Sequence, residues 1–244
     1  MDARIITWVF FTIFSTPSSA TLMQFYASHF NVEANKNYED LSLTVDGISV
    51  SISAYTINND GNGTILDLTK VTGQNLGVYV DDKATDGYIG VKSNNKSTNL
   101  NGVDDASEPD EGLLFVFDQP VFLDFIDFDF FTSSKNDSFN LTVDDVNQLF
   151  DINADQLASN VQSVSGDFGE YTFTGISGTR FLIWGDEEKD NFRIDRIEVT
   201  AAPSIVAAAT PATVPEPSIL LLMGSGLIGL ILFRDEKLKV KSST

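Results

Sequence analysis

The sequence contains no cysteine and only one histidine, His29, near its start. Without cysteine the protein has no disulfide, no thiolate zinc site and no cysteine nucleophile. A single histidine excludes any metal site built on two histidines. A serine–histidine triad would have to use His29, which lies in a segment with no other catalytic signal, so we expect a structural or exposed histidine. Glycine-rich phosphate-binding loops are also absent from the sequence.

Basic residues are scarce. The 244-residue chain has 15 lysines and arginines against 35 aspartates and glutamates, a formal net charge of −20. Four of the acidic and five of the basic residues lie in the two end segments, which leaves 31 acidic against 10 basic residues between them. A surface of this sign repels phosphate backbones, which argues against nucleic acid as a partner. It attracts divalent cations, although solubility in a salty or extracellular medium explains the charge more simply.

The N-terminus carries a run of apolar residues, Ile5–Phe14, after a weakly positive start. Small residues follow, and Ser18 and Ala20 occupy positions −3 and −1 of a cleavage site before Thr21. This layout predicts a secretory signal peptide over residues 1–20. The alternative is a buried N-terminal strand, because Ile, Val and Phe also suit strands.

The C-terminal segment begins with a linker rich in Ala, Pro and Thr, residues 201–213. The uncharged apolar run Ser218–Phe233 predicts a single transmembrane helix, because 16 residues of helix span about 24 Å, a little less than the hydrocarbon core. Basic residues follow the apolar run, and they would stay on the cytoplasmic side and place the preceding domain outside. These basic residues are Arg234, Lys237, Lys239 and Lys241.

A proline-rich motif separates the linker from the apolar run. Its residues are Val214, Pro215, Glu216, Pro217 and Ser218. With the apolar helix and the basic tail, residues 214–244 resemble the PEP-CTERM sorting signal of exported bacterial proteins. Asp235 and Glu236 depart from that family's basic cluster, and an ordinary C-terminal anchor is the alternative.

The resemblance implies recognition by an exosortase, a membrane-embedded cysteine transpeptidase that would cut near Pro215–Pro217. It also implies a precursor held in the inner membrane through residues 218–233, and a destination at the cell surface or in the extracellular polysaccharide matrix. The prolines suit such a site, since helix cannot continue through them and the cleavable peptide stays extended.

The middle of the chain, residues 21–200, is typical of a sheet protein. About ten short runs alternate apolar and polar residues or are rich in Val, Ile, Phe, Thr and Tyr. They cover residues 41–45, 48–57, 64–69, 77–81, 113–118, 121–131, 138–144, 171–176, 180–185 and 192–200. Asp60–Gly63, between two of them, predicts a hairpin. Many short strands without alternating helices predict an all-β domain, an antiparallel β-sandwich of jelly-roll type.

Two segments, Glu111–Phe128 and Asp190–Val199, resemble the jelly-roll modules of PEP-CTERM and other surface-anchored bacterial proteins. Those modules look like carbohydrate-binding domains, so the resemblance implies extracellular polysaccharide as a candidate partner. Only Val146–Val161 has apolar spacing that suits a helix. Asp151–Gln162 begins like a calcium loop but lacks the required central glycine and final acid, so we predict a helix or turn there.

The densest acidic cluster precedes a predicted strand. Its members are Asp104, Asp105, Glu108, Asp110 and Glu111. Calcium takes six to eight oxygen ligands from carboxylates and carbonyls, which loops supply. The cluster is therefore a candidate Ca²⁺ site, completed by a second acidic segment such as Asp81–Asp86 or Asp186–Asp190. A solvated acidic loop is the alternative.

We expect a structural or adhesive role and not an enzyme. The competing hypothesis is a secreted glycan hydrolase, in which Asp127 and Asp129 share one strand face about 7 Å apart. Phe128 and Phe130 would then face the core. Such aspartate pairs are routine on an exposed sheet face, however.

Aromatic residues offer little more. Trp184 and Tyr171 could line a sugar platform, although a tryptophan among apolar residues more often lies in the core.

Overall fold

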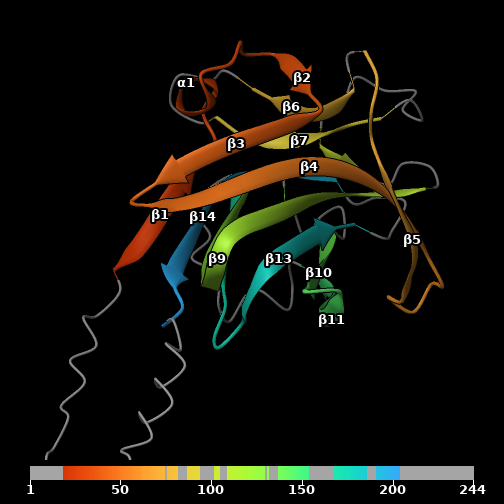
Figure 1. Cartoon of the computed structure of the whole chain (residues 1–244). Helices are drawn as coiled ribbons and strands as arrows, with labels where there is room; N and C mark the ends of the chain where they lie inside the picture. Colours follow the sequence, from red (N-terminus) through yellow and green to blue (C-terminus); the bar gives the residue numbers. More distant parts are fainter. Residues whose placement is uncertain are drawn as a thin grey trace, which may run out of the picture. The chain divides into compact units, whose positions relative to one another are not determined.

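The structure is a computed structural model that describes residues 19–74, 76–81, 87–93, 102–104, 109–129, 131, 137–153, 168–185 and 191–203. These residues form 14 strands, paired antiparallel, and one four-residue helix (Figure 1). The predicted all-β, antiparallel fold is therefore confirmed. The predicted leader up to residue 18, and the linker and sorting signal from residue 204 on, lie outside the described residues.

Hydrogen bonds connect all 14 strands into one sheet. The elements are β1 (Ala20–Gln24), α1 (Ala27–Phe30), β2 (Lys36–Tyr38), β3 (Asp40–Val45), β4 (Ile48–Asn59), β5 (Ile65–Lys70), β6 (Gly77–Val80), β7 (Ile89–Lys92), β8 (Val103–Asp104), β9 (Asp110–Asp129), β10 (Ser138–Val143), β11 (Val146–Asn153), β12 (Phe168–Thr172), β13 (Ser177–Trp184) and β14 (Asn191–Ala201).

Strand β9 organises the sheet because its two halves have different neighbours. Its first half lies between β4 and β13, and its second half between β14 and β12. The exchange from β4 to β14 occurs around Pro120, which has no amide hydrogen to give to a ladder. The sequence pattern predicts two strands broken at this proline, whereas the chain continues through it as one strand of 20 residues.

The core is rich in phenylalanine. Phe128 contacts the rings of Phe131, Phe139 and Phe192 at centroid distances of 4.9–5.2 Å. A second group around Phe115, Phe117 and Phe181 belongs to the same apolar cluster, so aromatic side chains from distant strands share one interior. Edge-to-face packing of such rings adds to their burial in stabilising the sheet.

The predicted hairpin at Asp60–Gly63 is confirmed as the turn between β4 and β5. One Asp60 carboxylate oxygen accepts hydrogen bonds from the amides of Asn62 (2.9 Å) and Thr64 (3.0 Å). These bonds hold the pKa of Asp60 below its ordinary value. Beyond the turn, β5 passes over the outer face of the sheet, which is the face opposite the phenylalanine-rich core (Figure 1).

The predicted helix at Val146–Val161 is wrong in its described part, because Val146–Asn153 form strand β11. The register of β10 against β11 shifts twice, and Asp151 has a positive φ of 51°. An extra residue in a strand breaks the alternation of period two. The resulting apolar spacing imitates that of a helix, which explains the error.

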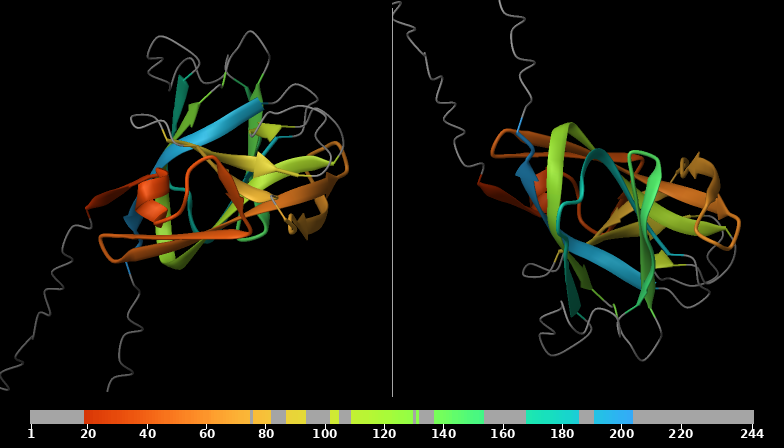
Figure 2. Two further views of the ribbon diagram at one scale, coloured as in Figure 1. Left: turned by 90° about the horizontal axis from the view of Figure 1, so that it is seen from above. Right: turned by 90° about the horizontal axis from the view of Figure 1, so that it is seen from below.

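The first and last strands of the domain are neighbours. Ala20 pairs with Thr200 and Thr21 with Val199, in antiparallel register. Figure 2 shows β1 and the end of β14 side by side in both views. Met23, in the middle of β1, is fully buried, so this short strand is part of the core.

Candidate functional site

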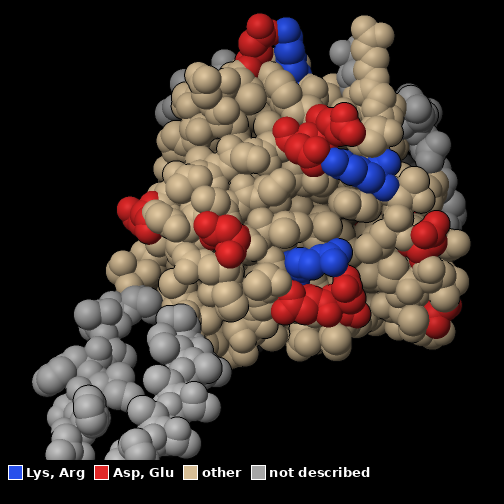
Figure 3. All heavy atoms as spheres, in the orientation of Figure 1, with Lys and Arg blue, Asp and Glu red and all other residues tan. Residues whose placement is uncertain are grey.

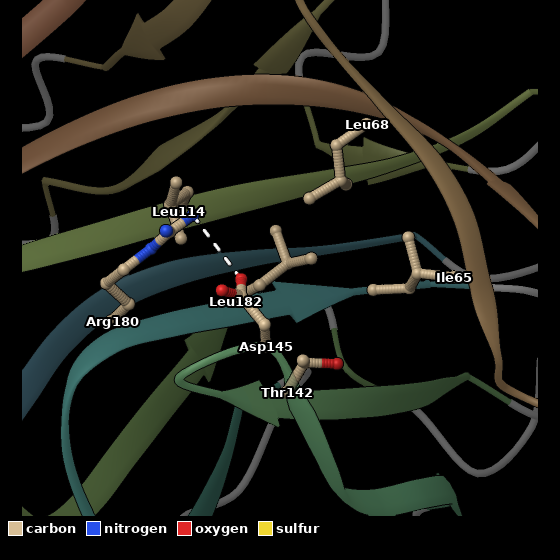
Figure 4. A pocket seen from close by; sticks show the side chains of 7 residues that line it. All are labelled: Ile65, Leu68, Leu114, Thr142, Asp145, Arg180 and Leu182. Carbon is tan, nitrogen blue, oxygen red and sulfur yellow. Dashed lines mark ion pairs between the residues drawn. The ribbon is translucent and has the colours of Figure 1, made fainter.

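A cavity of about 140 Å³ lies between the outer face of the sheet and strand β5 (Figure 4). Ile65 and Leu68 of β5 form one wall, and Leu114 of β9 and Leu182 of β13 face them. The remaining lining residues are Thr142, Asp145 and Arg180. The cavity adjoins a second, smaller apolar cluster that includes Ile57 and Trp184, on the sheet face opposite the main core.

The hairpin tip is attached to the neighbouring strand β11. The side-chain amide of Asn147 donates a hydrogen bond to the carbonyl oxygen of Gly63 at 3.2 Å. Gly63 has a φ of +83°, and its Cα lies so close to the ring of Phe150 that a Cβ would overlap it. The β4–β5 hairpin therefore closes over the sheet face like an arch, and we call it the arch below.

A two-residue turn positions the polar end of the cavity. Asp144 and Asp145 join β10 to β11 with φ angles of 47° and 66°, the pattern of a type I′ turn. One Asp144 carboxylate oxygen accepts hydrogen bonds from the amide of Thr179 (3.1 Å) and the amide of Arg180 (2.9 Å). Sequence analysis missed this turn, although Asp-Asp between two runs of strand-forming residues was the available signal.

The polar end of the cavity faces solvent, whereas its interior does not. The side chains of Asp145 and Arg180 are 71% and 43% exposed and lie 3.5 Å apart as an ion pair. Leu114 and Leu182 are buried. The Nε of Arg180 is buried and has no hydrogen-bond partner among the described residues, so the guanidinium retains donor capacity.

The face that carries the arch is not uniformly acidic. Figure 3 shows basic side chains next to acidic ones on this face, and much of it is uncharged. The cavity lining itself contains one carboxylate and one guanidinium, which neutralise each other. A ligand here therefore meets no strong net charge in the site itself.

The acidic cluster is placed only in part. Asp104 ends β8, Asp110 and Glu111 begin β9, and Asp105 and Glu108 lie outside the described residues. Asp110 and Glu111 are each only 2% exposed, and Asp110 accepts a hydrogen bond from the side chain of Asn59. Among the described residues, no three Asp, Glu or His side chains come together as a metal site.

The strand ends around this cluster are nevertheless close in space. Asp104 pairs with Asn191, and the amide of Gly185 donates a hydrogen bond to the carbonyl of Glu111 at 3.2 Å. The strand before segment 105–109 therefore pairs with the strand after segment 186–190, and the strand after segment 105–109 pairs with the strand before segment 186–190. The expected contact between the two acidic segments stays a prediction, because residues 105–108 and 186–190 lie outside the described residues.

Asp127 belongs to an ionic row across three strands. Arg196 of β14 donates from Nε to Asp127 at 2.8 Å and from Nη2 to Glu170 of β12 at 2.9 Å. Burial raises the pKa of Asp127 above its ordinary value, and the nearby Glu170 adds to this, although Arg196 opposes it. Asp127 and Asp129 are buried, so the strand face opposite Phe128 is covered and not solvated.

The described aromatic residues and the histidine considered in the sequence lie in the core or on the surface, outside the cavity. Trp184 is fully buried, as its apolar neighbours in the sequence suggest, and Tyr171 packs on Phe139 and Phe173. His29 is exposed, and its Nδ1 lies 2.9 Å from the carbonyl oxygen of Gln24. Phe128 is buried as predicted, and the side chain of Phe130 lies outside the described residues.

The sorting residues Val214–Ser218 and the basic residues Arg234, Lys237 and Lys239 also lie outside the described residues. No helix in the described part of the chain has the length and apolar character to cross a bilayer. No curated protein and no solved structure matches the chain. Residues 213–237, however, match the family model of the PEP-CTERM protein-sorting motif. The chain therefore carries a PEP-CTERM protein-sorting motif, which implies export as a membrane-anchored precursor that an exosortase processes.

Proposed function

We propose that the all-β domain is a non-enzymatic structural or adhesive module that binds extracellular polysaccharide at the cell surface or in the matrix. The sorting motif at residues 213–237 is the observation that carries this proposal, because it addresses the domain to the cell envelope. The cavity beneath the arch supports it, since a partly apolar hollow with a few convergent polar groups is the usual form of a small-ligand site.

The domain is, in this proposal, a jelly-roll-like β-sandwich. The two halves of β9 belong to its two layers, since each half has its own pair of neighbouring strands. The phenylalanine core fills the space between the layers. Such domains present wide sheet faces and loop ends, both of which suit the binding of a polymer.

Calcium has a structural role in the same proposal. The ion joins the acidic segment around Asp105 and Glu108 to the segment 186–190, whose flanking strands are paired. The buried carboxylates of Asp110 and Glu111 lie at the base of that junction. A cation stabilises such a cluster of buried carboxylates because it offsets the repulsion among their negative charges and the cost of removing them from water.

A binding role is better supported than glycan hydrolysis. A hydrolase needs one carboxylate free to transfer a proton and another free to attack or to activate water. Asp127 instead accepts a hydrogen bond from Arg196, and it is buried along with Asp129. Both positions therefore suit structural roles in the sheet.

The proposal is tested in two steps on the native protein. Mass spectrometry of both termini, from cells with and without the exosortase, is expected to show Thr21 as the first residue in both. A cut near Pro215–Pro217 should appear only with the exosortase. The exported protein is then mixed with matrix polysaccharide from the same cells and sedimented. Retention of the protein supports the proposal, and a protein that stays in solution, or that is full-length in the cytosol, overturns it.

A further inference from the structure

The cavity beneath the arch combines features that point to one class of ligand. Its walls are branched aliphatic side chains, Ile65, Leu68, Leu114 and Leu182, with no aromatic ring among the lining residues. A flat stacking platform for a sugar ring is therefore not what this site offers. Aliphatic pockets instead accommodate methyl groups and short hydrocarbon edges, which gain free energy when they leave water.

The size of the cavity limits what enters. A volume of about 140 Å³ is close to that of apolar cavities that hold a single benzene-sized molecule. One edge of a six-membered ring with a methyl substituent fits this space. A long acyl chain does not.

The polar end of the cavity determines which polar groups the ligand carries. The carboxylate of Asp145 accepts hydrogen bonds from hydroxyl groups, and the guanidinium of Arg180 donates to hydroxyl oxygens. The two groups are 3.5 Å apart, so neighbouring hydroxyls on one sugar ring are within reach of both. Thr142, also in the lining, adds a hydroxyl near the apolar wall.

Charge selects a neutral ligand. The ion pair of Asp145 and Arg180 has no net charge, and the protein as a whole carries −20. A uronic acid or a fatty acid would bring a carboxylate toward Asp145 and toward an acidic protein. A neutral sugar experiences no such repulsion.

We propose that this cavity binds a neutral methyl-bearing sugar, a 6-deoxyhexose unit of a polysaccharide. Its methyl group lies among Leu68, Leu114 and Leu182, and its ring hydroxyls bind Asp145 and Arg180. This inference rests on the proposed polysaccharide-binding function and names the sugar class that the domain recognises. A hexose with a hydroxyl on carbon 6 would place that hydroxyl among the leucines without a partner, so it binds more weakly.

The test uses pairs of sugars that differ only at carbon 6, L-rhamnose with L-mannose and L-fucose with L-galactose. Calorimetric titration of the exported protein is expected to give a Kd of about 1 mM for at least one deoxy sugar. Its 6-hydroxy counterpart is expected to bind about tenfold more weakly. Equal affinities within both pairs, or no binding of any of the four sugars, overturn the inference.

Variants connect the binding to the cavity. Asp145→Asn keeps a residue that tolerates positive φ and removes the carboxylate, and it is expected to weaken binding about fivefold or more. Leu68→Phe fills the cavity and is expected to abolish binding. Leu66→Ala is the matched control, because Leu66 is on the same strand but 63% exposed, and it is expected to bind like the native protein. Deoxy-sugar binding that survives both Asp145→Asn and Leu68→Phe overturns the assignment to this cavity.

Two failures are distinguishable. If matrix polysaccharide binds the native protein and the Leu68→Phe variant equally, the cavity assignment fails and the proposed function stands. If a free deoxy sugar binds in the cavity while the polysaccharide does not bind, the proposed function fails and the cavity assignment stands. If the protein binds butanol but none of the four sugars, the cavity is a site for purely apolar ligands, and the inference is also overturned.

Discussion

The side-chain amide of Asn147 donates a hydrogen bond to the carbonyl oxygen of Gly63, 84 residues earlier in the chain. This hydrogen bond joins the tip of the β4–β5 arch to strand β11, whose Phe150 ring also lies against Gly63. It explains why β5, which pairs with β4 and with no other strand in the described part of the chain, remains over the sheet face. The cavity exists because the arch is attached at both its base and its tip.

Replacement of Gly63 by alanine should loosen the arch. The Gly63→Ala variant introduces both an unfavourable positive φ and an overlap with the ring of Phe150. Gly61→Ala is the matched control, because Gly61 also has a positive φ but nothing lies within 4 Å of its Cβ position. We expect a loss of about 1 kcal/mol for Gly61→Ala and about 2–3 kcal/mol for Gly63→Ala in urea denaturation. Equal losses would show that Phe150 does not constrain the tip.

The hairpin turn should make stability depend on acid pH through Asp60. Because its folded-state pKa lies below the ordinary value of 3.8, the ionised carboxylate favours the folded state. This contribution is present above pH 3.8 and is lost as the pH falls through the lower, folded-state pKa. Asp60→Asn should therefore lower the thermal midpoint at neutral pH and match the native protein in strong acid. A constant difference across the titration would contradict this assignment.

The ionic row across β12, β9 and β14 should make stability depend on pH in the opposite sense to Asp60. The folded-state pKa of Asp127 is raised, so the protonated carboxyl favours the folded state. This stabilisation is present below pH 3.8 and is lost as the pH rises through the folded-state pKa. Arg196→Met leaves Asp127 and Glu170 as neighbouring carboxylates without a cation. We expect a loss of about 2 kcal/mol at pH 7, and less near pH 4, in chemical denaturation.

A control for this row is Arg180→Met. Its ion pair with Asp145 is largely exposed, so the change should cost less than about 1 kcal/mol at either pH. If Arg180→Met and Arg196→Met had equal effects, burial would not be what strengthens the row.

Calcium should stabilise the exported protein. At a concentration about 100 times its Kd, a ligand that binds only the folded state adds about 2.7 kcal/mol, which raises the melting midpoint by several degrees. We expect EGTA to reverse this shift and the Glu111→Gln variant to reduce it, whereas Asp67→Asn, on an exposed position of β5, should leave it intact. A midpoint that is unchanged by calcium and chelator removes the calcium site.

Alternation of apolar and polar residues was sufficient to predict most of the long strands. Leu41 and Leu43 of β3 are buried between exposed neighbours, as their pattern indicates. The pattern failed where backbone irregularities interrupt it, as at Asp151 in β11. Short strands such as β2 and β8 have too few residues to show any period.

The candidate site was harder to predict than the fold. Leu68, Leu114 and Leu182 look like ordinary core residues in the sequence, and only the folding of the arch over the outer face brings them together. Arg180 is the first residue of a predicted strand, where no local pattern marks it as part of a site. The sorting signal, by contrast, is contiguous in sequence, which is why it could be recognised without a structure.

The pairing of β1 with β14 imposes an order on maturation. The peptide bond between Ala20 and Thr21, where we predict leader removal, lies inside a paired strand once β14 has arrived, and Thr21 is then almost inaccessible. A peptidase needs that bond exposed, so we expect it to act while the last strand is still being translocated. After leader removal the new first residue, Thr21, lies beside Val199, so the start of the mature domain and the end of its last strand are neighbours.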